Sequence, residues 1–303
     1  MLGADFQHKI NQILSEFNST WIDLKTSFDY VFEAALDFGK ETGSCHGSQT
    51  ITTLASQPGY SLNPDFLEIL TKDDHNDGLL KYYDGSCTEW LTWESYSDFL
   101  QNENAAGTPN SFAVLDDAIP TRLTGAATSI GLQVGGESVL TDVTGAFASL
   151  YPGDTVINTT KSYYGYVIAK PTSATAVTTA MFDLSSRGGS YAGWAVNDDY
   201  IIQPAPRYKI FLDPPPSSAG NIVTVSYIAK PSPVYSDYGT YSFATGYEDA
   251  LIKYAAWLYK HRDSKPQFGD PLYIAYERAM RKGKSVNRKA VGAVGFRVNW
   301  VKG

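Results

Sequence analysis

The sequence predicts an α+β protein in which helices lie at both ends of the chain and β structure lies between them. Three observations support this prediction. Apolar residues recur at helical spacing near both termini, residues 118–205 contain many short apolar runs separated by turn residues, and three consecutive prolines separate two strand-like runs. We expect the helices from the two ends to pack together as a helical core.

Four helices are expected from apolar stripes at three- and four-residue spacing. Ser19 or Thr20 is expected to cap the second helix, which should stop near residues 39–43. The last helix should begin with Asp270 as N-cap and Pro271 at the first helical position, because both residues are favoured there. The first and third helices are predicted at residues 5–18 and 247–261.

The first half of the chain also carries strand patterns. Strands are predicted at residues 49–54, 60–62, 66–70, 79–82 and 111–116. Between them, TEWLTWESYSDFLQNENAAG is expected to be helical in part and to end at Gly107. The reason is that Trp90, Trp93, Tyr96 and Phe99 recur every three residues, which is the spacing of one helical face.

Residues 118–205 differ in composition from the rest of the chain, because they are rich in Thr, Ser, Gly and Ala. Many short strands with frequent turns are typical of an antiparallel sandwich or barrel. The strands are predicted at 130–134, 139–143, 154–158, 163–169, 175–182 and 200–203. Farther on, RYKIFL and IVTVSYIA flank DPPPSSAGN and predict a β-hairpin, since prolines mark a turn rather than the inside of a strand.

These patterns divide the chain into three parts. Residues 1–117 and 206–283 are expected to form one core of helices and β-hairpins. Residues 118–205 are expected to be an inserted antiparallel β-sandwich or barrel module. Residues 284–303 are expected to be an extended C-terminal docking arm.

Charge is distributed unevenly along the chain. Residues 278–303 hold eight of the 24 Lys and Arg residues and no Asp or Glu, which leaves 16 basic and 32 acidic residues in the first 277. The acidic body argues against nucleic-acid binding over most of the surface, because such binding needs cations that displace the counterions of phosphates. The basic tail is the exception.

The sequence predicts neither a membrane protein nor a secreted disulfide scaffold. The N-terminus MLGADFQHKINQIL lacks the basic start and apolar core of a signal peptide, and no run approaches 18 apolar residues. Cys45 and Cys87 are expected to be reduced thiols. We therefore expect a soluble protein made in a reducing cytoplasm.

No common catalytic fingerprint occurs in the sequence: GxxxxGK[ST], GxSxG, HExxH and CxxC are all absent. Cys45 and His46 are adjacent, whereas a nucleophile and its base normally come from distant segments. Asp198 and Asp199 are adjacent too, and successive strand residues point to opposite faces, so they cannot flank one bond. The sequence therefore predicts no enzyme and no cofactor.

One loop has a partial calcium-loop pattern. In KDDHNDGLLKYYD, Asp73, His75, Asp77, Gly78 and Asp84 fall at positions 1, 3, 5, 6 and 12 of that template. Position 3 holds His rather than an oxygen ligand, and position 12 holds Asp rather than Glu. A polar hairpin turn is the favoured interpretation, so no metal ion is predicted, although ion binding by this loop stays open.

The basic tail combines cations with apolar residues. The segment KGKSVNRK is predicted to be flexible, and FRVNWV alternates apolar and polar residues like a strand that adds to another sheet. A pure phosphate-binding arm would not need large aromatic residues. We expect a protein-docking arm whose contact residues are Lys284, Arg288, Lys289, Phe296, Arg297 and Trp300, and a nucleic-acid contact stays open for Arg288 and Lys289.

The order of features over most of the chain resembles the head-to-tail connector (adaptor) proteins of tailed bacteriophages, particularly short-tailed ones. The segments that carry the resemblance are WIDLKTSFDYVFEAALDF, PGYSLNPDFLEIL, GTPNSFAV, RYKIFLDPPPSSAGNIVTVSYIAKP and GYEDALIKYAAWLYKHRDSKPQFGDPLYIAYERAM. In the second segment, Asn63-Pro64 stands near the Leu-Pro of the family pattern Tyr-x-Leu-Pro-x-Asp-Phe. Residues 118–205 depart from the family, and their YPGDTVIN and WAVNDDYII resemble a β module added in virion proteins.

The resemblance implies a structural virion protein in the neck, assembled in the host bacterial cytoplasm and acting in DNA ejection. Adaptors of this kind form a ring, expected to be a dodecamer, beneath the portal ring, and their C-terminal segment grips the portal. They dock the tail or nozzle protein and extend the channel, so that genomic DNA is only passing cargo. Residues 118–205 would then face a tail fibre or fibre adaptor, and no membrane would be involved.

A second hypothesis is a tail or receptor-binding component whose β insertion recognises host glycan. An enzyme of carbohydrate chemistry ranks lowest, because the sequence lacks suitably paired acids.

Overall fold

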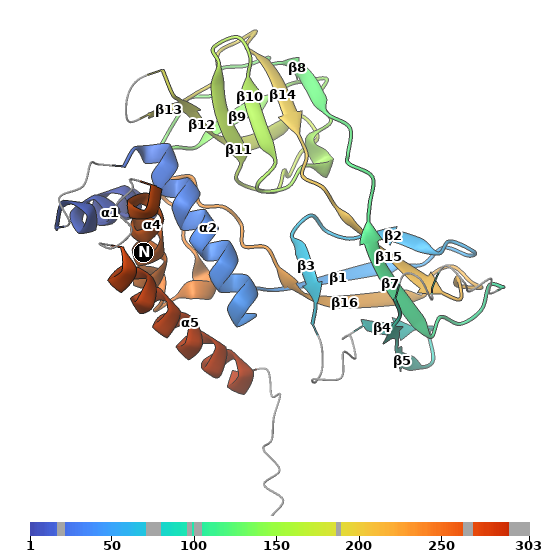
Figure 1. The fold of residues 1–303 in the computed structure, drawn as a ribbon. Helices are drawn as coiled ribbons and strands as arrows, with labels where there is room; N and C mark the ends of the chain where they lie inside the picture. Colours follow the sequence, from blue (N-terminus) through green and yellow to red (C-terminus); the bar gives the residue numbers. More distant parts are fainter. Residues whose placement is uncertain are drawn as a thin grey trace, which may run out of the picture. The chain divides into compact units, whose positions relative to one another are not determined.

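The computed structural model describes residues 1–16, 22–70, 80–95, 99, 105–185, 189–262 and 269–290. Helices and several mainly antiparallel sheets make up the chain, as the predicted α+β class requires (Figure 1). The described residues form two compact units. One holds the described residues of 1–37, 118–206 and 231–277, and the other holds those of 38–117, 207–230 and 278–290.

The helices expected at both ends of the chain are confirmed, and α1 packs against α4. Their bounds are α1 Ala4–Glu16, α2 Leu24–Thr42, α4 Glu248–Arg262 and α5 Asp270–Ala290. The predicted caps Ser19 and Thr20 lie outside the described residues. Asp23 caps α2 instead, because its Oδ1 accepts a hydrogen bond from the backbone N–H of Thr26 at 2.8 Å.

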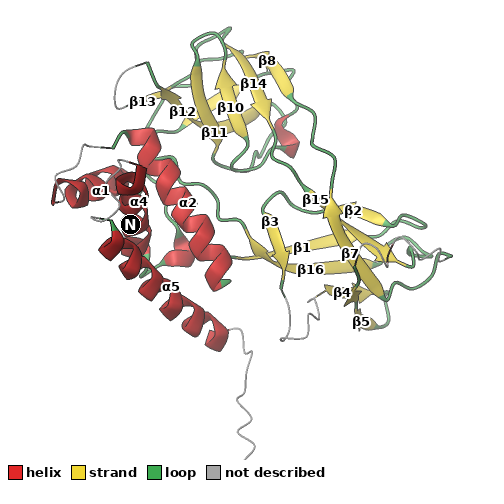
Figure 2. Cartoon of the chain, in the orientation of Figure 1, coloured by secondary structure: helices red, strands yellow, loops and turns green. Residues whose placement is uncertain are grey.

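Residues 118–206 contain a seven-stranded antiparallel sheet that curves into a half-barrel (Figure 2). Its strands are β8 Leu123–Ala126, β9 Ser138–Thr141, β10 Thr155–Asn158, β11 Tyr163–Val167, β12 Ala176–Asp183, β13 Ser190–Ala192 and β14 Asp199–Gln203. Six of them run in the order β13-β12-β11-β10-β14-β8, and β9 pairs with β12. Inward-facing side chains such as Phe147, Val156 and Trp194 fill its core.

The predicted strand at 130–134 is wrong, and β8 and β13 were not predicted. Only isolated bridges occur at the first site, between Gly131 and Trp194 and between Val134 and Glu137. The double glycine 135–136, with φ of +56° and +88°, turns the chain there before a ladder can form. β8 and β13 are short and lack an alternating apolar pattern, so they depend on pairing with distant strands.

Two smaller sheets share one core in the second unit. The first has the order β1-β16-β4-β5 with β3 on β16, and the second has the order β2-β15-β7-β6. Their bounds are β1 His46–Thr52, β2 Gly59–Ser61, β3 Phe66–Ile69, β4 Leu80–Tyr83, β5 Thr88–Trp90, β6 Thr92–Trp93, β7 Ser111–Asp116, β15 Tyr208–Asp213 and β16 Ile222–Ala229. All pairs are antiparallel except β6 with β7.

The predicted hairpin between β15 and β16 is wrong. β15 pairs with β2 and β7, whereas β16 pairs with β1, β3 and β4, so the two strands belong to different sheets. The three prolines at 214–216 supply no N–H donor to a tight turn, and the segment instead carries the chain from one sheet to the other.

The segment TEWLTWESYSDFLQNENAAG was predicted to be helical in part, and its residues 88–93 form β5 and β6 instead of helix, while residues 96–98 and 100–104 lie outside the described residues. Trp90 and Trp93 are 50% and 48% exposed, whereas Leu91 between them is buried. The backbone N–H of Leu91 donates to the carbonyl of Leu80, which ties this segment to β4. Alternate burial along a strand therefore overrides the three-residue spacing of the aromatic residues.

Residues 118–206 group with helices in the first unit, whereas the sequence placed them as an insertion in a core of helices and hairpins. Aromatic rings join helix and sheet there. Tyr235 stacks on Tyr166 of β11 with centroids 4.3 Å apart, and Phe28 of α2 lies 6.3 Å from Phe182 of β12. The division into an independent module and a separate core stays a prediction.

Tyrosine hydroxyls in both units donate to aspartate carboxylates. The pairs are Tyr235–Asp29 at 2.9 Å, Tyr276–Asp37 at 2.6 Å, Tyr227–Asp65 at 2.9 Å, Tyr200–Asp142 at 2.8 Å and Tyr191–Asp237 at 2.8 Å. Each pair satisfies a hydroxyl on a largely buried ring. Part of the tyrosine and aspartate content is therefore structural.

Candidate docking interface

The first two turns of α5 are held against the helices of the first unit. Leu272 and Tyr276 are buried on one side of α5. The Tyr276 hydroxyl donates to Oδ2 of Asp37 on α2 at 2.6 Å, and the ring lies 4.7 Å from that of Tyr254 on α4. Burial raises the pKa of Tyr276, and the Asp37 carboxylate raises it further, so the hydroxyl stays a donor.

The later turns of α5 pack within the second unit. Gly283 is buried, and a Cβ at this position would lie 2.9 Å from Cγ2 of Thr42 and 3.1 Å from Cζ of Phe38. The glycine thus permits a close approach that explains its place inside a helix. Beside it, Nζ of Lys284 lies 2.6 Å from Oε2 of Glu41, and the hydrogen bond from Lys284 lowers the pKa of Glu41. This partly exposed pair contributes about 0–1 kcal/mol.

The side of α5 opposite these contacts carries cations. Arg278, Arg281 and Lys282 are all exposed. At about 100° per residue, they lie across the helix from Tyr276 and Gly283. No Asp or Glu follows Glu277 in the sequence, so α5 contains no acidic residue from Arg278 to its end at Ala290.

The predicted docking residues fall into two groups. Lys284, Arg288 and Lys289 lie within α5, and Phe296, Arg297 and Trp300 lie outside the described residues. The prediction that KGKSVNRK is flexible is therefore wrong, because these residues continue the helix to Ala290. Apart from Gly283, the segment contains no helix breaker, and packing accommodates that glycine. Lys284 is engaged by Glu41 and does not belong to a free arm.

Sequence reasoning missed Glu41, Asp37 and the contact at Gly283. Gly283 was a usable signal, because a glycine inside a helix lowers helix stability by about 1 kcal/mol relative to Ala. A glycine among good helix formers therefore indicates that a neighbouring segment packs closely there. The two carboxylates gave no such signal. Their partners are roughly 240 residues away in the chain, with separations of 243 for Lys284–Glu41 and 239 for Tyr276–Asp37.

The structure places Cys45, Asp198 and Asp199 in different surroundings. Burial, with a smaller effect from Asp65, raises the pKa of the Cys45 thiol to about 11, whereas a nucleophilic thiol needs a lowered pKa. Asp198 is buried and Asp199 is exposed, so the two carboxylates face different surroundings, as predicted.

The calcium-loop pattern is only partly covered by the structure. Asp73, His75, Asp77 and Gly78 lie outside the described residues. Asp84 organises a turn, because its Oδ1 accepts hydrogen bonds from the backbone N–H groups of Ser86 at 2.8 Å and Cys87 at 2.7 Å. These bonds, that of Cys87 foremost, lower the pKa of Asp84. Among the described residues, no group of three or more acidic, His or Cys side chains is arranged to hold a metal ion.

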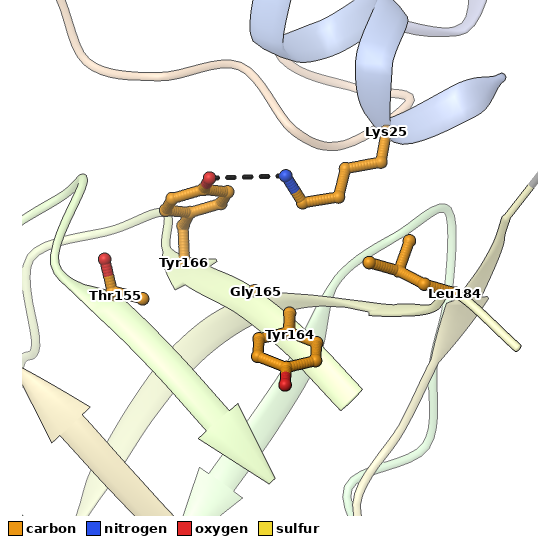
Figure 3. Close-up of a pocket in the computed structure, with 6 residues that line it drawn as sticks. All are labelled: Lys25, Thr155, Tyr164, Gly165, Tyr166 and Leu184. Atoms are coloured by element: carbon orange, nitrogen blue, oxygen red, sulfur yellow. Dashed lines mark hydrogen bonds between the residues drawn. The ribbon is translucent and has the colours of Figure 1, made fainter. Parts of the chain in front are cut away.

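A shallow hollow of about 260 Å³ lies beside β11 in the first unit (Figure 3). Tyr164 and Tyr166 point to the same face of the sheet, and Gly165 between them faces the other way, against Met181. Nζ of Lys25 donates to the Tyr166 hydroxyl at 3.4 Å and also lies 2.7 Å from Oδ2 of Asp29. Thr155 and Leu184 complete the lining. The hollow offers an aromatic floor and one ammonium group.

Comparison with protein families and with curated proteins finds no match to this chain. Within the described ranges, none of the helices is both long enough and apolar enough to cross a bilayer.

Proposed function

We propose that this chain is a structural virion protein of the neck, which forms the adaptor ring between the portal and the tail. In this role it docks to the portal through its C-terminal segment, meets the tail or nozzle protein with another face, and extends the channel through which genomic DNA passes during ejection. The order of sequence features along the chain supports the family assignment. The proposal needs no catalytic site.

The observation that carries the proposal is the arrangement of α5. One side of the helix is anchored by Tyr276, Gly283 and Lys284, and the other side is basic. The helix therefore serves as a rigid base from which residues 291–303, with Phe296 and Trp300, reach a partner. Such a base lowers the ordering cost of docking, because the chain is already helical up to Ala290.

Electron microscopy of the full chain mixed with the portal protein of the same phage tests the proposal. We expect added density in the form of a ring at one pole of the portal, with the same rotational symmetry or a simple ratio to it. A portal that stays bare at micromolar concentrations of both proteins would exclude the adaptor role.

The hollow beside β11 favours one alternative function, a tail or receptor-binding component that recognises host glycan. Tyr164 is 44% exposed and offers a flat apolar face, and Lys25 could bind an acidic or hydroxyl group of a sugar. Binding of the full chain to a glycan array tests this function. Tyr164→Ala should reduce binding at least tenfold, whereas Tyr83→Ala, which alters a tyrosine that is 40% exposed in the other unit, should not. An array without any bound glycan would remove this alternative.

A further inference from the structure

Four cationic residues recur on one side of α5 by helical spacing. Arg278 and Lys282 are exposed in the structure, and helical spacing places positions 288 and 289 on the same third of the circumference, about 16 Å farther along the axis at most. Within the described residues, no hydrogen bond or ion pair engages Arg278 or Lys282. We name Arg278, Lys282, Arg288 and Lys289 the basic stripe.

A contribution to helix stability does not explain why these cations are present. Cations stabilise a helix through its dipole only in the last turn, which accounts for Arg288 and Lys289. Arg278 and Lys282 lie two or more turns before the end at Ala290. They are also four residues apart, a spacing at which like charges destabilise a helix. A polyanion bound along this side would relieve that repulsion.

The chemistry of the stripe fits phosphate better than an acidic protein surface. Between positions 278 and 285, the exposed side chains of α5 are Arg278, Arg281, Lys282 and Ser285. The exposed apolar side chain on this side, Ile274, lies one turn before the stripe, whereas protein interfaces are anchored by buried apolar or aromatic groups. Guanidinium groups match phosphate oxygens in a bidentate geometry. Double-stranded DNA presents about ten phosphates over 16 Å of its axis, which is ample for four cations.

We propose that the basic stripe of α5 binds the phosphate backbone of double-stranded DNA without sequence preference. The contact itself is independent of the adaptor role. Its use rests on the proposed function: in a ring, repeated stripes would form one basic band that retains DNA, while the acidic remainder of the chain lets DNA slide.

Fluorescence anisotropy of the full chain with a labelled 30-base-pair duplex tests the proposal. With four phosphate contacts, affinity should fall about 100-fold between 50 and 200 mM salt, because the logarithm of the affinity changes with a slope of about −0.9 per contact. Arg278→Glu combined with Lys282→Glu should weaken binding at 50 mM at least tenfold and reduce the salt dependence to about tenfold. The neutral pair Arg278→Gln and Lys282→Gln should lie between these proteins.

The matched control is Lys9→Glu combined with Arg122→Glu, which changes the net charge equally at two exposed positions of the first unit. It should bind like the unaltered chain. Equal loss in this control would show that only net charge matters and would overturn the proposal, as would absence of binding by the unaltered chain at 50 mM salt. If the stripe variant instead kept its DNA binding and lost the portal, the stripe would contact protein. If the unaltered chain bound DNA with the expected salt dependence but did not bind the portal, the adaptor role would be refuted and the stripe proposal would stand.

Discussion

Deletion of residues 291–303 is expected to abolish binding of the chain to the portal protein while leaving its fold intact. The deletion begins after Ala290, so α5 keeps its full length, its bond from Tyr276 to Asp37 and its pair between Lys284 and Glu41. The segment removed contains Phe296 and Trp300, and large aromatic residues dominate the energy of protein interfaces. We expect a loss of affinity of at least 100-fold, measured by co-sedimentation or surface plasmon resonance.

The double substitution Phe296→Ala and Trp300→Ala tests whether these two aromatic side chains, rather than the rest of residues 291–303, supply the affinity for the portal. Each anchor should contribute about 2 kcal/mol or more, which is roughly 30-fold in affinity. Trp90→Ala combined with Trp93→Ala is the matched control, because these tryptophans are about half exposed and lie on β5 and β6. Portal binding that survives the deletion, or that falls equally in the control, would contradict the docking-arm proposal.

Asp198→Ala is expected to lower the free energy of unfolding by about 2–3 kcal/mol, the second large effect. The Oδ2 atom of Asp198 accepts hydrogen bonds from the backbone N–H of Ala195 at 2.8 Å and from Nδ2 of Asn158 at 2.9 Å. It also lies 2.9 Å from Nζ of Lys161, whose side chain is 34% exposed and can turn to water when the carboxylate is lost. The expected loss of unfolding free energy is therefore smaller than the full cost of breaking a buried ion pair.

Asp199→Ala is the control, since it removes the neighbouring carboxylate from an exposed position. It should change stability by no more than about 0.5 kcal/mol. The shift in the urea midpoint, followed by circular dichroism, measures both variants. Equal midpoints for the two variants would show that Asp198 does not organise this part of the half-barrel.

The contribution of Asp198 should also depend on pH. Burial by itself would raise its pKa, but the hydrogen bonds from Ala195, Lys161 and Asn158 together lower the pKa below its ordinary value of 3.8. A lowered pKa in the folded state gives stability that is present above pH 3.8 and is lost as pH falls through the folded-state value. The difference between the unaltered chain and Asp198→Asn should therefore be constant from about pH 5 to 8 and shrink below about pH 4.

Helix positions and most strand positions of this chain could be predicted, because they follow from local periodicity. The stripe of α4 and the Asp270-Pro271 start of α5 are local signals, and neither depends on distant residues. The same holds for β7, β10, β11 and β12, whose positions agree with the predicted strands to within a few residues.

Errors arose where pairing or packing with distant residues decided the outcome. The sequence pattern around 214–216 is the same for a hairpin loop and for a crossover between sheets, and only the available partners of β15 and β16 distinguish them. Residues 88–93 have helical spacing but become strands, because Leu91 is buried in the core of two sheets. At the candidate interface, the basic character of the tail was visible, whereas its helical first part was not.

The sequence by itself determined the α+β class, the basic C-terminus and the absence of familiar catalytic motifs. Each depends on composition or on residues close together in the chain. Only the tertiary structure decided which strands pair, which aspartates serve tyrosine hydroxyls, and where the basic side of α5 faces. The physical reason is that these features depend on contacts between segments far apart in sequence, such as Tyr276 with Asp37 and Gly283 with Phe38, and such contacts leave little trace in local periodicity.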